Sequence, residues 1–346
     1  MSLFEQQTEY VGVDIGAGGI RLVQLKRGGT KPPLVTYGHL QTRPGLTTSD
    51  SPADLVQVAQ ALRKLVKDAR VTAKAVVAGV PSSKVFASVI STPKLSSADL
   101  GKSIRLQADQ YIPMAVKDVR LDWYVMGPGK TENEQEVLLV AAPNTVTEKY
   151  VSIFQQAGLE LLALEPNALA LARAVVQPGD LAVVTLDIGS VATDITIVHN
   201  NMPKLLRSIN IGGGTFVKAV AQNLGLDDAQ ADQFTRKFGL TQTKLEGQVL
   251  KAIKPSLDQL VGEIEKSIKF FLGQYPEVKL EKLVLTGGTT ALPELPTYLS
   301  TATGLAVEIA NAWSKVAYQA QLQDQLMSVA TQYGVAVGLA ERDLLG

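Results

Sequence analysis

Residues 183–190 read VVTLDIGS, and residues 10–17 form a second copy that reads YVGVDIGA. In each copy an apolar strand leads into an aspartate, an isoleucine and a glycine, and a second alternating apolar strand follows at once. A single Asp-Ile-Gly is usually a plain turn after a buried strand. Two copies with matching flanks indicate instead a duplicated structural unit with a functional turn in each half.

The two turns combine a carboxylate with a bare backbone. Gly16 and Gly189 carry no Cβ, so a phosphate can approach the peptide N–H groups closely. Asp14 and Asp187 cannot bind phosphate themselves, but they can hold Mg²⁺, usually through water, and the metal neutralises the phosphate. Two such turns facing each other predict a clamp for a nucleoside triphosphate.

The composition is that of a globular chain large enough for two or more domains. The chain has 346 residues, of which 46% are hydrophobic and 19% are charged. Lys+Arg and Asp+Glu balance at 33 each, so no overall positive field favours nucleic acid. The absence of cysteine excludes disulfides, thiolate zinc sites and thiol catalysis. His39 and His199 alone leave little material for a histidine metal site or a Ser/His triad, and we expect both at strand ends or in loops.

The sequence shows neither a secretory signal nor a membrane-spanning segment. Residues 1–10 lack both the basic region and the apolar core of a signal peptide. No stretch of about 18 uncharged apolar residues occurs, which is the length that a transmembrane helix needs. We therefore expect a cytoplasmic protein that reaches the inner face of the cytoplasmic membrane only through a partner.

The order of strands and helices is that of a ribonuclease-H-like domain, repeated once. In the second half, the three-strand meander begins again at residue 181. Inside the first half, residues 82–164 read as strand, helix, two strands, helix and strand, which predicts an inserted α+β subdomain. The predicted elements of the first half are strands at residues 10–14, 20–26, 34–41 and 74–79 and a helix that begins at Pro52.

Two further glycine-rich segments accompany the second half. Residues 212–215, GGGT, precede an apolar helix, whose N-terminus offers free N–H groups and the positive end of a dipole to a phosphate. Residues 287–289, GGT, end a buried strand. Small residues in two helices, at 165–174 and 325–340, predict that these helices cross between the halves.

This ordered set of motifs resembles the signature of the actin-like ATPases, a superfamily that includes sugar kinases, heat-shock chaperones, actin and the division protein FtsA. The resemblance covers nearly the whole chain and implies an α/β fold of two ribonuclease-H-like domains with a small inserted α+β subdomain, as in FtsA. It divides the chain into a first domain at 1–81, 165–180 and 325–346, an inserted subdomain at 82–164, and a second domain at 181–324 with a nucleotide-binding helical subdomain at about 216–280.

Finer features resemble one family, the type IV pilus assembly proteins PilM. Residues 107–114, QADQYIPM, occupy the place where that family has Glu-Ala-x-x-Tyr-Ile-Pro-Phe, and residues 263–267 and 333–340 are also similar. The chain departs from the family at residues 17–19, where Ala-Gly-Gly replaces hydroxyl residues, and at Lys266, where arginine is usual. Both departures reduce the hydroxyl or planar contacts available to a nucleotide.

The resemblance implies ATP and Mg²⁺ as ligands in a cleft between the halves. Asp14 and Asp187 would position Mg²⁺. Glu165 stands where related ATPases orient the attacking water, although a charged helix start explains it equally well. Such proteins are better described as ATP-binding adaptors than as fast enzymes, so at most slow hydrolysis is expected. The other residues implied at the nucleotide are Gly16, Gly18, Gly189, Ser190, Gly212, Gly213, Thr215, Glu263, Lys266, Gly287, Gly288 and Thr289.

The implied partner is the N-terminal cytoplasmic tail of PilN, a membrane protein of the pilus alignment complex. In the family this tail lies in a groove between the insertion and the first core domain. The candidates near that groove are Tyr111, Ile112, Pro113 and Met114, and the alternative is that these residues pack the insertion's own core. Three other functions of the fold stay open: an FtsA-like filament former, a sugar or acetate kinase, and a type II secretion relative without its membrane anchor.

Overall fold

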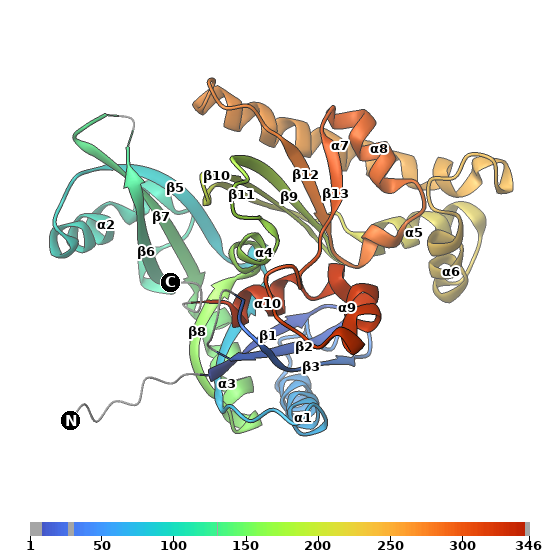
Figure 1. Ribbon diagram of the computed structural model, residues 1–346, viewed down its shortest axis with the longest axis horizontal. Helices are drawn as coiled ribbons and strands as arrows, with labels where there is room; N and C mark the ends of the chain where they lie inside the picture. The colour runs from blue at the N-terminus through green and yellow to red at the C-terminus, as the bar shows by residue number, and fades with distance from the viewer. Residues whose placement is uncertain (1–8, 27–30, 130, 343–346) are drawn as a thin grey trace.

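The computed structural model describes residues 9–26, 31–129 and 131–342. Within these residues it contains two five-stranded sheets and one three-stranded sheet. Figure 1 shows the two larger sheets in separate halves of the molecule, with helices α4 (Asn167–Val175) and α10 (Gly334–Ala340) between them. The smallest sheet extends to one side, at the upper left of that view.

The first sheet has the strand order β3-β2-β1-β4-β8. Its first three strands form an antiparallel meander, whereas β4 runs parallel to β1 and β8 parallel to β4, each reached through a helix, as parallel pairing requires. Apolar side chains are buried on both faces, under α1 and α3 on one side and under α4 and α10 on the other. The elements are β1 (Glu9–Gly16), β2 (Gly19–Lys26), β3 (Leu34–Gln41), α1 (Pro52–Asp68), β4 (Ala75–Val80), α3 (Asn144–Ala157) and β8 (Glu160–Pro166).

The second sheet repeats this arrangement in the order β11-β10-β9-β12-β13. Val184 and Leu186 of β9 pack under α5, α7 and α8, whereas Val183 faces the helices between the halves. The duplication predicted from the two Asp-Ile-Gly segments is therefore confirmed. The elements are β9 (Ala182–Ile188), β10 (Thr193–His199), β11 (Met202–Ile209), α5 (Gly213–Leu224), α6 (Asp228–Phe238), α7 (Gln248–Gln274), β12 (Lys282–Thr286), α8 (Leu295–Thr303) and β13 (Ala306–Ile309).

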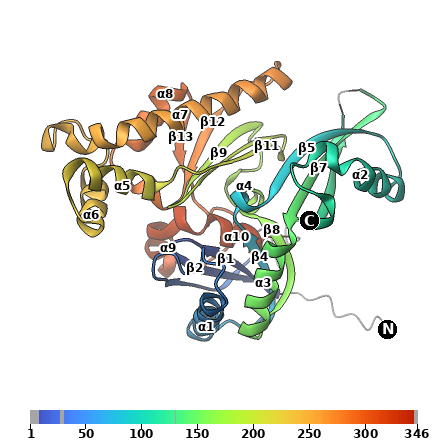
Figure 2. The same ribbon diagram turned by 180° about the vertical axis from the view of Figure 1, so that it is seen from behind.

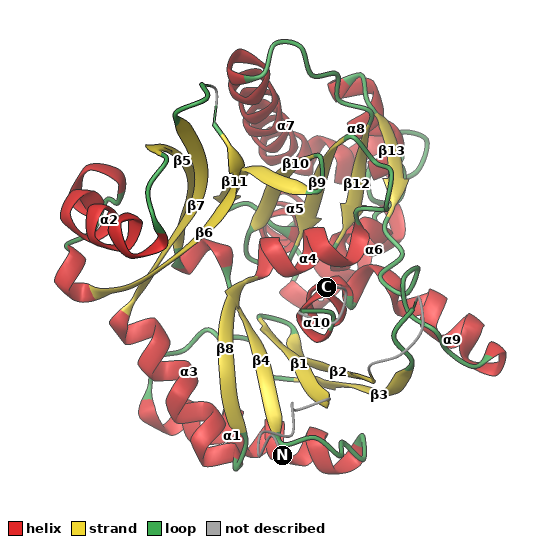
Figure 3. Ribbon diagram, turned by 60° about the vertical axis from the view of Figure 1, so that its left-hand side comes forward, coloured by secondary structure: helices red, strands yellow, loops and turns green. Residues whose placement is uncertain are grey.

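The inserted subdomain is smaller than the expected segment 82–164. Its sheet has the order β5-β7-β6, and α2 covers one face. The last helix and strand of the expected segment, α3 and β8, belong instead to the first sheet, because β8 pairs in parallel with β4 and α3 is the crossover between them. Figure 3 shows β8 as an outer strand of that sheet. The insertion comprises β5 (Phe86–Pro93), α2 (Ser97–Tyr111), β6 (Val119–Pro128) and β7 (Glu134–Pro143).

The insertion is also bonded to the second half. Glu136 of β7 forms an ion pair with Lys204 of β11. The hydroxyl of Tyr275, just after α7, donates a hydrogen bond of 2.6 Å to Glu136 Oε1. Both carboxylate oxygens of this buried glutamate therefore bind groups of the second half.

The helices between the halves touch through their backbones. A Cβ on Gly338 of α10 would lie 1.7 Å from the carbonyl oxygen of Ala170 in α4, and one on Gly12 of β1 would lie 2.2 Å from that of Ala336. The predicted crossing of small-residue helices is thus confirmed. The second of them is not continuous over 325–340, because the chain forms α9 (Gln323–Val329) and a 3₁₀ turn before α10. The 3₁₀ turns are Ser82–Lys84, Val116–Asp118, Leu245–Gly247, Gly288–Ala291, Ala320–Leu322 and Ala330–Gln332.

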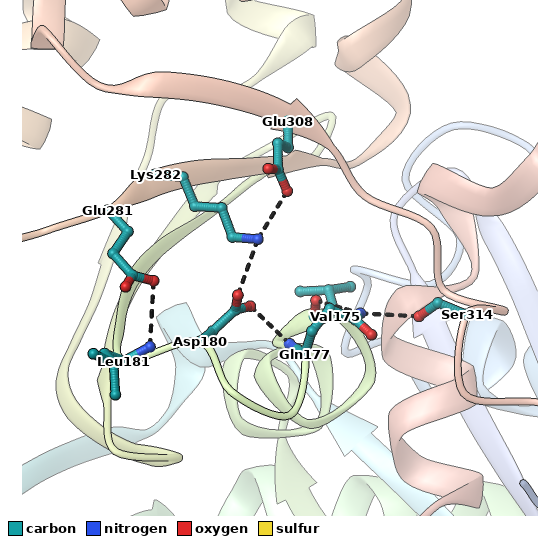
Figure 4. A network of polar contacts seen from close by, with 8 residues as sticks. All are labelled: Val175, Gln177, Asp180, Leu181, Glu281, Lys282, Glu308 and Ser314. Atoms are coloured by element: carbon teal, nitrogen blue, oxygen red, sulfur yellow. Dashed lines mark hydrogen bonds and ion pairs between the residues drawn. The ribbon is translucent and has the colours of Figure 1, made fainter.

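A polar network holds the segment that leads from α4 into the second sheet (Figure 4). Lys282 of β12 bridges Asp180 and Glu308, at 3.0 and 2.9 Å. Asp180 in turn accepts a hydrogen bond from the backbone N–H of Gln177, whose side chain reaches Ser314. These contacts fix the start of β9 and hence the position of Asp187 at its other end.

Among the helices that the structure describes, none combines the length and the apolar character needed to span a lipid bilayer.

Candidate functional site

Four turns from the two halves converge on one cleft of about 1360 Å³. They are the turn between β1 and β2, the turn between β9 and β10, the start of α5, and the turn that follows β12. Because β9 and β12 are parallel, their carboxyl ends reach the same edge of the sheet. The predicted residues that line this cleft are Asp14, Gly16, Gly18, Asp187, Gly189, Ser190, Gly213, Gly287, Gly288 and Thr289.

The glycines of the second half allow these turns to pack against one another. Gly287 has φ +95°, and a Cβ there would lie 2.4 Å from the Ile188 carbonyl oxygen and 2.5 Å from Asp187 Oδ1. A Cβ on Gly213 would lie 2.6 Å from Thr289 Oγ1. Any larger residue would therefore push the turns apart and displace the carboxylate.

The start of α5 differs from the predicted phosphate cradle. The N–H groups of Gly213 and Gly214 donate to the carbonyl oxygens of Gly189 and Ser190, each at 2.8 Å. The Thr215 hydroxyl accepts from the Gly212 N–H at 3.4 Å, so it caps the helix, and these two residues do not line the cleft within the described chain. The glycine run here fastens one turn to another, because its first N–H groups already have acceptors.

Three carboxylates are gathered at the centre of the cleft. Burial, together with the negative charges of Asp194 and Asp14 and against the opposing effect of Arg21, raises the pKa of Asp187 to about 7. Burial likewise raises the pKa of Asp14 and of Asp194. This excess of buried negative charge is the environment in which a divalent cation would be most strongly stabilised.

The arrangement fits Mg²⁺ bound with water and phosphate. In residues 9–26, 31–129 and 131–342, no three His, Cys, Asp or Glu side chains lie close enough together to form a metal cage. Mg²⁺ does not need one, since it commonly keeps several waters and takes one or two carboxylates together with a substrate phosphate. Asp14 and Asp187, both at the cleft, are suited to this mode.

Arg21 is a cleft residue that the sequence analysis missed. Its Nη1 lies 3.6 Å from Asp14 Oδ2, and its Nη2 donates to Gln332 Oε1 at 3.4 Å. Arg21 and Asp14 face each other across the β1–β2 ladder. His39, the residue opposite Arg21 on β3, also lines the cleft, and burial and Arg21 lower its pKa.

Helix α6, and not α7, brings charged side chains to the cleft among the described residues. Asp228, Asp232 and Arg236 of α6 line the same cleft as Gly288. Glu263 and Lys266 of α7 are not among the described residues at the cleft, because Glu263 is engaged on the outer surface by Arg207 and by Lys266 at 2.8 Å. The spacing of an acidic and a basic residue over one helical turn occurs in both helices, and only the fold distinguishes them.

Glu165 lies at the end of β8 and not in a helix start. Its carboxylate is 5% exposed and binds Arg173 at 2.5 Å and Arg342 at 3.6 Å. It does not line the cleft within the part of the chain that the structure describes. Two arginines therefore already neutralise the group that sequence comparison suggested for orienting water.

The four predicted groove residues lie at the end of α2, and three of them pack in the insertion while Pro113 is exposed. Ile112 is buried in the cluster between α2 and the three-stranded sheet, and Tyr111 and Met114 pack against that cluster. Pro113 follows Ile112, the residue that ends the helix. The structure thus agrees with the alternative that these residues form the insertion's own core.

Comparison with known proteins reveals the family. The sequence profile described as Type IV pilus assembly protein PilM matches residues 12–344. A solved PilM-PilN type IV pilus biogenesis complex superposes with a TM-score of 0.84 at 26% identity, over 97% of this chain and 98% of that chain.

More distant solved structures share the fold. The ethanolamine utilization protein EutJ from Carboxydothermus hydrogenoformans gives a TM-score of 0.56 at 16% identity, over 98% of this chain and 90% of its own. MreB5 of Spiroplasma citri bound to AMPPNP gives 0.54 at 12% identity, over 96% and 95%. These two likenesses establish an actin-like fold, and the profile match over nearly the whole chain shows that this protein belongs to the PilM family of type IV pilus assembly proteins.

Proposed function

We propose that this chain is an ATP-binding adaptor of the type IV pilus inner-membrane complex, which holds Mg-ATP in its central cleft and binds the N-terminal cytoplasmic tail of PilN. The observation that carries the proposal is family membership together with a relative of 26% identity whose solved structure is a PilM-PilN complex. An adaptor at this place would reach the membrane through its partner.

The cleft supports nucleotide binding through a division of charge. Mg²⁺, when bound, would supply the positive charge that offsets the phosphates, and Asp14 and Asp187 would hold it. Arg21 carries a fixed positive charge suited to a phosphate oxygen. The turns at Gly16 and Gly189 would let the phosphates approach the backbone.

The nucleoside would lie toward α6. Asp232 and Arg236 offer an acceptor and a donor there, in the cleft that Gly288 also lines. The ion pair between these two residues, at 2.7 Å, is exposed, so little energy would be lost if a sugar or base exchanged with it.

Slow hydrolysis at most agrees with the environment of Glu165. A general base must reach the attacking water, directly or through one water. Glu165 is buried against Arg173 and Arg342 and does not line the cleft in the described residues. This supports an adaptor whose nucleotide is chiefly a structural or regulatory ligand.

For the PilN tail we propose the face of the insertion sheet opposite α2. Trp123 and Leu121 of β6 pack toward α2, so the alternation of a strand directs Tyr124 to the other face, where it is 63% exposed. Leu162 of β8, the outer strand of the neighbouring sheet, is 45% exposed. Exposed apolar side chains and a strand with a free edge suit an extended peptide.

Titration calorimetry with a synthetic PilN N-terminal peptide tests the function. The peptide is titrated with and without Mg-ATP, and Asp187→Ala is measured in parallel. Saturable binding to the wild-type protein is expected, and a dependence on Mg-ATP that Asp187→Ala abolishes would show that the nucleotide controls the adaptor. Absence of peptide binding in both states, while ATP still binds, would overturn the proposal, and sedimentation of polymers with ATP would then favour a filament.

Two matched variants test the position of the tail. Tyr124→Ala is expected to weaken peptide binding about tenfold or more, because it removes an exposed aromatic anchor. Leu106→Ala, at a side chain of α2 that is 84% exposed, is the control and is expected to leave affinity unchanged. The reverse result would place the tail on the α2 side.

A further inference from the structure

Helix α1 ends in a basic surface that the adaptor function does not use. Arg63 and Lys67 are four residues apart on one side of the helix, Arg70 follows two residues after the helix ends, and all three are exposed. Lys74 is exposed immediately before β4. Figures 1 and 2 place α1 at the end of the first half that is remote from the second.

Nearby carboxylates do not neutralise this surface. Asp68 is engaged by Lys64 on the adjacent side of the helix. Glu160 begins β8 beside Lys74, where its N–H donates to the Lys74 carbonyl oxygen. Among the described residues, no carboxylate forms an ion pair with Arg63, Lys67, Arg70 or Lys74. Arg63 and Lys67 repel each other at i,i+4, whereas the helix dipole favours Lys67 in the last turn.

The backbone at Arg70 gives a second, independent observation. The helix closes with the N–H of Arg70 bound to the Lys67 carbonyl and that of Val71 bound to the Val66 carbonyl, at 3.1 Å each. This pair of hydrogen bonds requires a left-handed backbone at a residue just after the helix, and glycine is favoured at such a position. Arg70 occupies it at φ +53°.

Two other helices of the same chain use glycine at this position. Gly158 after α3 has φ +75° and Gly225 after α5 has φ +65°. Each is followed by a leucine whose N–H returns to the carbonyl five residues back, just as in α1. Arg70 thus occupies the kind of position that glycine takes after α3 and α5.

We infer that this basic surface, made of Arg63, Lys67, Arg70 and Lys74, rests on the anionic phospholipid headgroups of a membrane. In the stretch that carries the four cations, residues 57–94, no large apolar side chain is exposed, whereas Val56 near the start of α1 and Leu162 of β8 are exposed. A protein partner would require an apolar centre, and single-stranded nucleic acid would require aromatic side chains for stacking. Cations on an open surface match the diffuse negative potential of a membrane.

The inference goes beyond the binding of PilN, since it gives the protein a membrane contact of its own. That contact would be weak, because it includes neither an inserted apolar face nor a lipid anchor. It would act together with the tail of a membrane protein, and two weak attachments to one surface reinforce each other.

Co-sedimentation of the full chain with lipid vesicles, without PilN, tests the inference. The vesicles contain phosphatidylcholine alone or phosphatidylcholine mixed with phosphatidylglycerol. Binding only to the anionic vesicles, with loss at high salt, is expected. Equal binding to both kinds of vesicle, or no binding to either, would overturn the inference.

Matched triple variants assign the binding to this surface. Lys67→Gln with Arg70→Gly and Lys74→Gln is expected to bind about 100-fold more weakly, because each cation next to an anionic surface contributes about fivefold. Lys244→Gln with Lys251→Gln and Lys279→Gln removes the same charge from exposed sites in the second half and is expected to bind as the wild type does. Equal binding of the two triple variants would refute the assignment.

Arg70→Gly alone separates binding from folding. Glycine relieves the left-handed backbone, so the melting temperature is expected to rise while vesicle binding falls about fivefold. A fall in both, or a rise in stability without weaker binding, would contradict the inference. PilN-peptide titration of the same variant is expected to be unchanged, so a failure of the adaptor function would be recognised separately.

Discussion

The two Asp-Ile-Gly hairpins share a backbone and differ in the charge opposite the aspartate. In the first hairpin Asp14 faces Arg21 across the ladder. In the second, Asp187 faces Asp194 at the equivalent position. One hairpin therefore carries a balanced pair and the other two negative charges. The two hairpins have the same strand pairing, and they differ in the charge at a single cross-strand position.

The difference indicates which half suits a cation and which suits an anion. Two neighbouring carboxylates with raised pKa values are stabilised by a divalent metal. An arginine beside a glycine turn is stabilised by a phosphate. Substitutions on each hairpin test this comparison, and a buried carboxylate elsewhere provides a reference.

A buried carboxylate outside the cleft supplies the reference for pH effects. Glu341 is fully buried, and neither of its oxygens has a hydrogen-bond partner among the residues that the structure describes. Burial raises its pKa to about 7 against the opposing charges of Lys315 and Arg173. The folded protein therefore binds more protons than the unfolded chain between pH 4.5 and 7, so the free energy of unfolding falls as pH rises through that window. Glu341→Gln removes the titrating group. The decrease in the free energy of unfolding across this pH window is therefore expected to be smaller by on the order of 3 kcal/mol.

Denaturant unfolding at several pH values measures that effect, and ATP affinity serves as the control. Because Glu341 lies outside the cleft, its replacement is expected to leave ATP binding unchanged. An unaltered pH dependence of stability would show that Glu341 is not the group responsible.

Reversing the charge of the first hairpin is expected to have the largest effect on the nucleotide. Arg21→Asp gives the first hairpin the charges of the second, so phosphate loses a charged donor and meets a carboxylate. ATP affinity in excess Mg²⁺ should fall about 100-fold by calorimetry. Arg21→Lys keeps the charge and should lose far less. Equal affinities in all three proteins would break the comparison.

The turns themselves differ in crowding, which a pair of alanine substitutions can measure. Gly287→Ala places a Cβ against Asp187 on a backbone of φ +95°, and about 2 kcal/mol of stability should be lost. Gly18→Ala has open space within 4 Å and should change stability by less than about 0.5 kcal/mol. Thermal unfolding of both variants decides, and similar losses would mean that the first turn is as tightly packed as the second.

The smallest effect concerns the metal. Asp194→Asn leaves one negative charge on the second hairpin, so the gain in ATP affinity that Mg²⁺ produces should shrink about tenfold. Asp228→Asn, at the α6 end of the same cleft, is the control and should keep the full gain. A full gain in both variants would remove Asp194 from the metal's surroundings.

The sequence predicted the turns because each is a local pattern. Each motif is recognisable within a segment of eight residues, which contains Asp14 or Asp187 and the glycine that follows. The repetition of the segment identifies the two halves. Arg21 has no such signal, since an arginine in a strand is ordinary until the register shows what it faces. The one available clue was the repeat, because Asp194 lies seven residues after Asp187 just as Arg21 lies seven after Asp14.

Long-range pairing explains what the sequence could not reveal. The choice of sheet for β8 depends on its parallel partner β4, about eighty residues away, and the insertion between them hides that partner. Glu263 and Lys266 match a motif in spacing, but the direction of α7 takes them away from the cleft. In both cases the local sequence indicated the strand or the residue pair correctly. Contacts with distant parts of the chain determined where it lies.

Glu136 connects the insertion, which is part of the first half, to the second half. The chain enters and leaves the insertion from the first half, yet this carboxylate is bound by Lys204 and Tyr275 of the second. If the two halves rotate about the backbone contact of α4 and α10, either the insertion sheet must follow the second half or this buried ion pair must break. If the insertion follows the second half, the distance between the insertion and β8 changes as the cleft closes.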